Sequence, residues 1–400
     1  MKVYIVTNEA YPHGMAAALR ITCYAKALLM VGIGVEVVIY FRSEISNKPR
    51  NTLLSGTHNG VEYRYVCDTT IREKSLLKRK FYDYRDRTKA IKYLKTHMVK
   101  GDAILAYLRQ DVFTKSLIRF AHNHKYPIVR DFCEYPYATT NIEKDTEEKC
   151  IKYMKDIFKS FDGSICISEN LLTLARTYNP NGNHIKVPIL IDESNKDFSK
   201  VRAKELDYKY IFHAGTLYQQ KDGILDVLDA FSRAIKKLPN NTKYIFTGYL
   251  EASPDAESIR NKITNLGLEE NVLFLGYLSD IELLEYEKGA SLFIINKLDN
   301  LQNKYCFATK TGEYLLTGNP VLITNIGETN QYLTNRHSAY IVEHNNILQM
   351  ADTIIYALTH SKESKEIGFK GRQVAKKSFT VASQSNSLKL FFEELVCTSI

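Results

Sequence analysis

Two short segments combine charged residues with glycines where strands are expected to end. The segment KTGEYLLTGNPV places Lys310 and Glu313 three residues apart, so a helix would bring both side chains to one face. The Gly-Asn-Pro sequence that follows ends this helix, and residues 321–324 predict the next strand. A lysine and a carboxylate near a helix N-terminus suit a polar or anionic ligand. Favourable placement of an acid near the helix dipole is the alternative explanation for Glu313.

The second segment, HAGTLYQQKDG, follows an apolar run that predicts a strand over residues 210–213. Small residues around Gly215 would let the backbone approach a ligand, and Lys221 comes shortly before the next helix. Helix N–H groups together with a lysine ammonium make a phosphate site, whereas the alternative is a solvent-exposed loop lysine. Both segments fall at strand carboxyl ends within one domain, about 90 residues apart, so we interpret them as two halves of one site.

Three further polar clusters follow predicted strands in the first half of the chain. The loop after the first strand opens a helix through Gly14, a second loop carries Asp131 and Glu134, and a third carries Ser168 and Glu169. Carboxyl ends of parallel strands share one edge of a sheet, so these clusters are interpreted as an acceptor-binding wall. Helix caps and turns are the alternative for each cluster, and Ser168 is a good N-cap candidate.

Apolar runs alternate with helical segments along the chain, with a polar interruption over residues 186–207. Continuous apolar strands between helices indicate parallel sheets that are covered on both faces. The predicted fold class is therefore α/β, with two doubly wound Rossmann-like domains that face each other across a cleft. We predict an N-terminal domain over 1–195 and a C-terminal domain over 196–378. A final helix, 379–400, is expected to pack back on the first domain.

Composition and cysteine usage limit the class of protein. The 400 residues include 44% hydrophobic and 25% charged residues, which is ordinary for a globular protein and too much chain for one core. No apolar stretch is long enough to span a membrane, and the N-terminus predicts a strand instead of a signal peptide, so we expect a soluble, cytoplasmic protein. Seven cysteines without a Cys-x-x-Cys pair argue against disulfides and against a zinc site.

The net charge of +9 is concentrated locally, since residues 72–100 carry eleven lysines and arginines against three acids. Interleaved apolar residues predict a basic amphipathic helix, which would suit an anionic membrane surface on the cytoplasmic side. A solvated helix face is the alternative, and nucleic acid is disfavoured because no recognition motif accompanies the helix. Gly32 and Gly34 lie between a helix and a strand, the reverse of the dinucleotide-binding order, which argues against a nicotinamide dehydrogenase.

These motifs together resemble glycosyltransferase family 4, the "group 1" retaining glycosyltransferases of the GT-B fold, over nearly the whole chain. The most specific match is the segment from Glu313 to Thr324, which is similar to the family's E-A-M-A-x-G-x-P-V-I-x-T element. Residues 215–223 resemble its G-R-L-x-x-x-K-G phosphate element, and residues 187–192 resemble its interdomain V-P-N-G-V-D. Gly14 and Arg20 match the family's first loop and helix.

The resemblance implies transfer of a sugar, with retention, from a UDP- or GDP-linked nucleotide-sugar to a glycan or lipid-linked acceptor in surface polysaccharide synthesis. It implies no metal and no other cofactor. Lys221 would contact the donor diphosphate and act in catalysis, while Glu313 would contact the donor ribose. In many members of the family a first-domain histidine contacts the donor sugar or acceptor, and here Asp131 or Glu134 would take its place in catalysis. The other implied donor-binding residues are Gly14, Gly215, Thr216, Thr309, Lys310 and Thr311.

Two positions depart from the family pattern. Thr216 stands where the phosphate element has arginine, for which Lys310 is the candidate substitute, and Tyr305 stands where the first glutamate of a Glu-x7-Glu pattern is expected. Two alternatives stay open, namely a GT-B-like nucleotide-sugar epimerase and, because of these departures, a catalytically inactive GT-B-like binding protein. The sequence does not determine the sugar, base, acceptor, linkage or oligomeric state.

Overall fold

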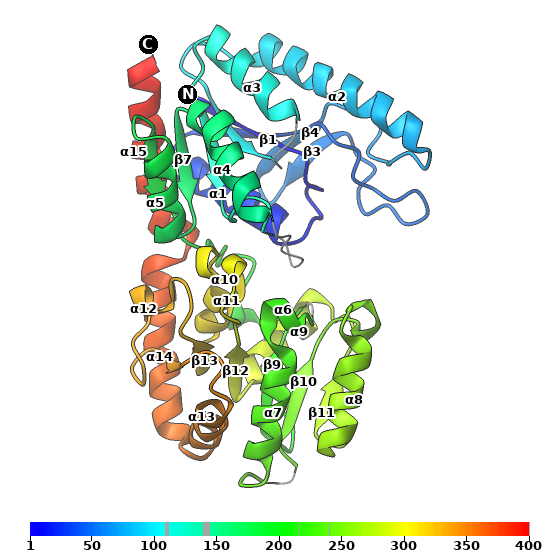
Figure 1. Cartoon of the computed structure of the whole chain (residues 1–400), viewed down its shortest axis with the longest axis vertical. Coiled ribbons are helices and arrows are strands. Elements are labelled where there is room, and N and C mark those ends of the chain that lie inside the picture. Colours follow the sequence, from blue (N-terminus) through cyan, green and yellow to red (C-terminus); the bar gives the residue numbers. More distant parts are fainter. Residues whose placement is uncertain (109–111, 139–144, 216, 240, 400) are drawn as a thin grey trace. The chain divides into compact units, whose positions relative to one another are not determined.

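The computed structural model describes residues 1–108, 112–138, 145–215, 217–239 and 241–399 (Figure 1). The chain divides into two compact units, one made of Met1–Ile191 with Val381–Ile400 and the other of Asp192–Thr380. We call them the N-unit and the C-unit. The chain thus passes between units at 191/192 and at 380/381, where the sequence predicted 195/196 and 378/379.

The N-unit is built on an eight-stranded sheet with the order β3-β4-β2-β1-β5-β6-β7-β8. Its neighbouring strands are parallel except for the β3–β4 hairpin, which the apolar pattern did not predict. Later strands are added on one side of β1 up to β4 and on the other side from β5 onward. The loops after β1 and β5 therefore run in opposite directions from the carboxyl edge of the sheet. The strands are β1 Lys2–Thr7, β2 Gly34–Ile39, β3 Ser55–His58, β4 Val61–Tyr65, β5 Ala103–Tyr107, β6 Ile128–Phe132, β7 Gly163–Cys166 and β8 Asn183–Lys186.

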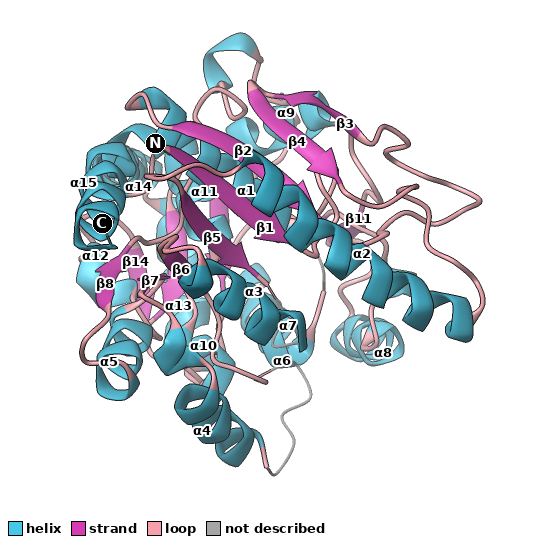
Figure 2. Cartoon of the chain, turned by 90° about the horizontal axis from the view of Figure 1, so that it is seen from above, coloured by secondary structure: helices cyan, strands magenta, loops and turns pink. Residues whose placement is uncertain are grey.

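Helices cover both faces of this sheet (Figure 2). Helices α1 and α15 share one hydrophobic cluster with the strands, and α2 and α3 share another on the opposite face. The final helix packs against α1, as predicted, and places Phe391 and Phe392 in the core. The backbone N–H of Val381 donates to the carbonyl of Ile191 at 3.1 Å, which joins the two crossing points. The helices are α1 Ala16–Met30, α2 Leu76–His97, α3 Val112–Asn123, α4 Thr146–Asp156, α5 Glu169–Tyr178 and α15 Val381–Ser399.

The C-unit contains an all-parallel sheet with the order β11-β10-β9-β12-β13-β14. Its strands are continuous apolar runs, as two-sided burial requires, and the order reverses between β9 and β12. The strands are β9 Tyr210–His213, β10 Lys243–Phe246, β11 Val272–Phe274, β12 Leu292–Ile295, β13 Val321–Thr324 and β14 Tyr340–Val342. The helices are α6 Gln219–Asp222, α7 Ile224–Ile235, α8 Ala256–Leu266, α9 Asp280–Gly289, α10 Leu301–Tyr305, α11 Thr309–Thr317, α12 Thr329–Tyr332, α13 Ile347–Thr359 and α14 Ser361–Ser378.

The packing of α15 generates a stability prediction. Phe392 is fully buried in the N-unit core, whereas Leu390 on the same helix is 66% exposed. We expect Phe392→Ala to lower the free energy of unfolding by about 3–5 kcal/mol, because it removes a buried ring and leaves a cavity. Leu390→Ala should change it by less than about 0.5 kcal/mol. Urea unfolding of both variants measures the difference, and equal effects would mean that α15 is not part of the core.

Candidate active site

The predicted residues of the C-unit converge where β9 and α11 meet. The backbone turns sharply after β9 at Gly215, whose φ of +114° favours glycine. A Cβ at this position would lie 3.1 Å from Nζ of Lys310, on the first turn of α11. Gly215 therefore leaves room for the lysine side chain, and it does so at the reversal of strand order where ligands of such sheets bind.

Further charged side chains surround Lys310. Its Nζ lies 3.3 Å from Nε2 of His213, the last residue of β9. Lys297, which follows β12, donates to a carboxylate oxygen of Asp222 at 2.6 Å. The pair is nearly buried, because Asp222 is 5% exposed. The site thus gathers two lysines, a histidine and one carboxylate from four segments that are distant in sequence.

The electrostatics of this cluster favour an added anion. Burial lowers the pKa of Lys310, and the positive charges of Lys297 and Lys221 act in the same direction while Asp222 opposes them. Burial alone would raise the pKa of Asp222, but Lys297 and Lys310 together hold it well below its usual range. One ionised carboxylate therefore lies among several cations, so a diphosphate would relieve their mutual repulsion.

The first turn of α11 adds backbone donors to the site. Thr309 begins the helix, and Thr311 is fully buried with a hydroxyl that finds no hydrogen-bond partner among the described residues. N–H groups at a helix N-terminus are unpaired and favour negative charge. Lys221, on α6, keeps an exposed side chain while its carbonyl oxygen accepts from Lys297 at 3.2 Å. Thr216 lies outside the described residues.

Glu313, in the second turn of α11, interacts electrostatically with Lys310 and also with a buried ion pair. Lys196 donates to both carboxylate oxygens of Glu287, at 3.0 and 3.2 Å, and Glu287 is 1% exposed. Burial raises the pKa of Glu287 to about 7 even though Lys196 pulls it down, and the charge of Glu313 adds to the rise. Glu313 is partly exposed and interacts electrostatically with Lys196. The buried pair of Lys196 and Glu287 therefore lies within electrostatic reach of Glu313, the predicted ribose ligand.

In the N-unit, Asp131 at the end of β6 is enclosed by other polar groups. It accepts from Nε of Arg20 at 3.2 Å and from the hydroxyl of Tyr24 at 2.7 Å. Arg20 also donates to the carbonyls of Pro188 at 3.0 Å and Val187 at 3.3 Å. These contacts tie α1, β6 and the chain after β8 together, which suits a positioning residue. The predicted catalytic role of Asp131 stays a prediction.

The remaining predicted residues of the N-unit occupy the loops after β1 and β6. A Cβ on Gly14 would lie 2.3 Å from the carbonyl oxygen of Ala10, so only glycine fits this turn. Glu134 has an exposed side chain two residues beyond β6. Ser168 caps α5 by accepting from the N–H of Leu171 at 3.2 Å, which confirms its expected cap position.

Residues 194–374, which contain this cluster of cations, match the family model for glycosyl transferases group 1. We call residues 194–374 the group 1 domain, after the family model that they match. A comparison with curated proteins finds no match. The group 1 domain spans almost the whole C-unit and includes Gly215, Lys221, Lys310 and Glu313.

Solved structures show the fold that surrounds the group 1 domain. Sucrose-phosphate synthase from Thermosynechococcus elongatus matches with a TM-score of 0.72 and 13% identity, over 100% of both chains. Anabaena HepE in complex with UDP and glucose matches with a TM-score of 0.69 and 16% identity, over 98% of this chain and 99% of that one. An Escherichia coli trehalose-6-phosphate structure bound with UDP-2-fluoro glucose matches with a TM-score of 0.67 and 14% identity, over 98% and 99%. The GT-B fold predicted from the sequence is confirmed.

Sequence reasoning missed several residues of the group 1 domain's site. Lys297 lies two residues beyond the apolar strand β12, so the same strand-end rule that selected Gly215 would have found it. The sequence analysis included His213 only as the last residue of a predicted strand and assigned it no role in the site. The pair Lys196 and Glu287 carries no local signal, because 91 residues separate its members.

The buried pair in the group 1 domain predicts a pH effect on stability. The pKa of Glu287 is about 7 when folded and about 4.3 in an unfolded chain, so the folded state binds more protons between these values. Its contribution to the free energy of unfolding therefore falls as pH rises from about 4.3 to about 7. Glu287→Gln should remove this decline by up to about 1.4 kcal/mol per pH unit.

Glu285 supplies a matched control on the same helix, since it is only partly buried. Urea unfolding of wild type, Glu287→Gln and Glu285→Gln at pH 5 and pH 7 measures the effect. If all three proteins show the same change between the two pH values, Glu287 is not protonated on folding.

Proposed function

We propose that the chain transfers a sugar, with retention, from a UDP- or GDP-linked nucleotide-sugar to a glycan or lipid-linked acceptor, in surface polysaccharide synthesis. The observation that carries the proposal is the cation cluster of Lys310, Lys297 and Lys221 at the strand reversal of the group 1 domain. Two GT-B structures with the same fold hold UDP or UDP-2-fluoro glucose, which supports a uridine donor. In this proposal Glu313 binds the donor ribose.

The chemistry requires stabilisation of a departing diphosphate. Negative charge builds on the diphosphate as its bond to the sugar breaks, and preorganised cations and helix N–H groups lower the energy of that state. Lys310, Lys221 and the first turn of α11 supply these groups, so the proposal needs no metal ion and no cofactor. Asp131 or Glu134 is proposed to act on the acceptor from the N-unit, and retention requires no enzymic nucleophile.

Thermal stabilisation by nucleoside diphosphates tests the donor site. A ligand that binds only the folded state at 100 times its Kd adds about 2.7 kcal/mol, so UDP, GDP, ADP and NAD can be ranked by the rise in Tm. We expect UDP or GDP to raise Tm. Lys310→Met and Glu313→Ala should weaken binding by about 10- to 100-fold, because each loses a charged hydrogen-bonding group.

The control variant is Glu366→Ala, an exposed glutamate on α14 of the same unit, which should bind like wild type. Release of free nucleotide only in the presence of an acceptor would separate a transferase from an epimerase. If no diphosphate stabilises the wild-type protein, the donor site is absent and the inactive binding protein becomes the better description.

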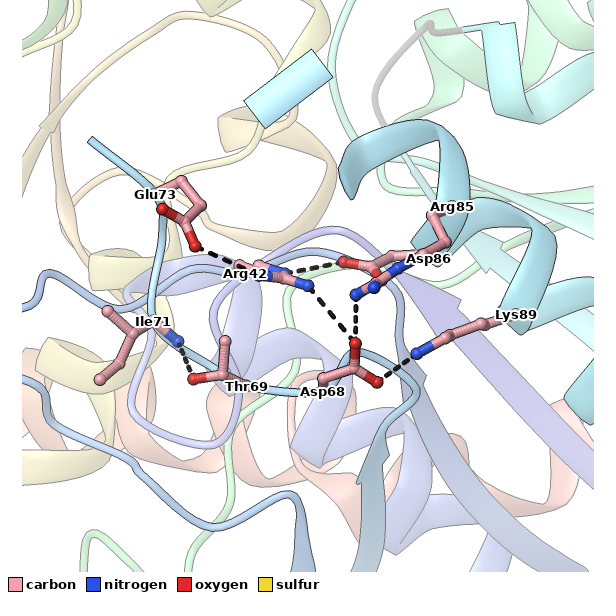
Figure 3. Close-up of polar contacts among 8 residues, drawn as sticks. All are labelled: Arg42, Asp68, Thr69, Ile71, Glu73, Arg85, Asp86 and Lys89. Atoms are coloured by element: carbon pink, nitrogen blue, oxygen red, sulfur yellow. Dashed lines mark hydrogen bonds and ion pairs between the residues drawn. The ribbon is translucent and has the colours of Figure 1, made fainter. Parts of the chain in front are cut away.

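We further propose that the start of α2 binds an anionic membrane surface. Charged residues that follow β2 and β4 hold the later turns of α2 in place (Figure 3). Buried Arg42 donates through Nε to Asp86 at 2.8 Å, and Asp68 pairs with Arg85 and Lys89. These contacts, together with the ring of Tyr82, whose centroid lies 3.9 Å from the guanidinium carbon of Arg42, fix the orientation of α2. None of them involves its first turn, residues 76–79.

The exposed residues at the start of α2, which we call the α2 patch, combine apolar and basic side chains. The large side chains Leu76, Leu77, Phe81 and Tyr84 are between 63% and 82% exposed. They alternate with exposed cations at positions 72, 74, 78 and 80. Apolar side chains that enter the lipid interface, beside cations that meet acidic headgroups, are typical of interfacial helices. No helix among the described residues is long and apolar enough to cross a membrane.

Charge reversal in the α2 patch tests the membrane proposal. Lys74, Lys78 and Lys80 have exposed side chains, so their substitution by Glu should leave the fold intact. Binding to vesicles that contain phosphatidylglycerol should fall at least about tenfold, since each cation near the surface contributes about 1 kcal/mol. The same change at Lys362, Lys365 and Lys370 of α14 alters net charge equally and should not affect binding. Equal loss in both triple variants would indicate a non-specific charge effect.

A further inference from the structure

A buried arginine in the N-unit lacks the partners that its charge requires. Arg130, the third residue of β6, is 5% exposed, and its Nε and Nη1 find no hydrogen-bond partner among the described residues. Its register neighbours are Ala106 on β5 and Ser164 on β7, neither of which is charged. An unpaired buried charge is unfavourable by several kcal/mol, and arginines are almost never fully buried without a partner.

Arg20 shows how the same unit treats a buried arginine with a structural role. Arg20 is 8% exposed and is satisfied by Asp131, by two backbone carbonyls and by the ring of Tyr24, whose centroid lies 4.7 Å from its guanidinium carbon. Arg130 precedes Asp131 in β6 and points to the other face of the sheet, because side chains alternate along a strand. The two guanidinium groups therefore differ in what surrounds them, and no ion pair of Arg130 is found among the described residues.

A second polar group without a partner lies near the face of β6 that carries Arg130, because the ring of Phe158 lies 4.8 Å from that of Phe132, two residues beyond Arg130, and 6.4 Å from that of Tyr153. Tyr153, on α4, is 2% exposed, and its hydroxyl has no hydrogen-bond partner among the described residues. Burial raises the pKa of Tyr153, and the charge of Arg130 opposes that rise, so the two groups interact electrostatically. A guanidinium has only donors, and a tyrosine hydroxyl is a good donor. One acceptor anion would satisfy both groups and would also neutralise the charge, which a water molecule cannot do.

Tyr137 connects this pair to the surface of the N-unit. It lies five residues beyond β6, and its φ of +64° places a non-glycine residue in the left-handed region. Its ring meets that of Tyr153 edge-on at 6.3 Å, while 38% of its side chain is exposed. Backbone strain of this kind persists where the surroundings enforce it and concentrates at ligand sites.

We propose that Arg130, Tyr153 and Tyr137 form an anion-binding site that recognises a phosphate or carboxylate group of the acceptor. The assignment to an acceptor rests on the proposed function, whereas the anion site itself rests on the two unsatisfied groups. Arg130 supplies the charge and directional donors that oxyanions prefer, and Tyr153 adds a third donor. Tyr137, which is partly exposed, packs edge-on against Tyr153. The acceptor is therefore an anionic glycan or a phosphate-bearing lipid carrier.

The test uses the full chain with Lys310→Met in the background, so that anion binding at the donor site is weakened. Inorganic phosphate and glucuronate are titrated separately against chloride at equal ionic strength, and Tm is recorded. We expect one of the two anions to raise Tm, which identifies the phosphate or the carboxylate class. Adding Arg130→Met should abolish the rise, and adding Tyr153→Phe should shift the half-saturating concentration upward by about tenfold.

The behaviour without added anion separates a binding role from a structural one. Methionine fills a similar volume without charge, so Arg130→Met should leave Tm of the anion-free protein unchanged or higher. An anion-induced rise that survives both Arg130→Met and Tyr153→Phe would overturn the proposal, as would the lack of any rise with either anion. Stabilisation by nucleoside diphosphate in the protein with intact Lys310 should be unaffected by Arg130→Met. Its absence there would contradict the proposed transferase function and not the anion site.

Discussion

Burial of both faces of each parallel sheet is the constraint on which the functional architecture depends. Most face positions of the central strands are occupied by apolar packing, so charged side chains gather mainly at strand ends, where they meet backbone donors and solvent. In the C-unit this edge brings together Gly215 after β9, Lys297 after β12 and Lys310 at the start of α11. At this edge Lys297 and Lys310 both act on a single buried acid, Asp222.

Local chemistry explains why parts of this site were readable from the sequence. The helix that carries Lys310 ends at Gly318, whose φ of +82° favours glycine, and the Asn-Pro sequence that follows cannot continue a helix. The predicted strand 321–324 therefore matches β13 residue for residue. The pair of Lys297 and Asp222 could not be read this way, because 75 residues separate them and only the adjacency of β9 and β12 brings them together. The β3–β4 hairpin was missed for a related reason: its outer strand is short and mostly exposed, so it carries no apolar run.

The same strand-end rule is less informative in the N-unit, because it does not say which face a side chain takes. Arg130 and Asp131 are consecutive and equally buried, yet alternation along β6 gives them opposite surroundings. Asp131 meets Arg20 and Tyr24 and is fully used in holding three segments together. Within the part of the chain that the structure describes, Arg130 meets no counter-charge. The sequence analysis selected the end of β6 correctly, but it chose Asp131, whose carboxylate already accepts hydrogen bonds from Arg20 and Tyr24.

Unsatisfied positive charge is the physical feature that the two units share. A folded protein that keeps Lys310 half-buried among other cations, or Arg130 buried without a partner, is less stable than one with apolar side chains in those places. That loss is recovered only when an anion binds, so the unfavourable electrostatics of the free protein become binding free energy in the complex. A sugar transfer from a nucleotide donor needs this property at the diphosphate. If the acceptor also bears an anion, its binding relieves the unfavourable electrostatics around Arg130. A neutral acceptor would leave the Arg130 charge uncompensated, so the N-unit would bind neutral sugars less tightly.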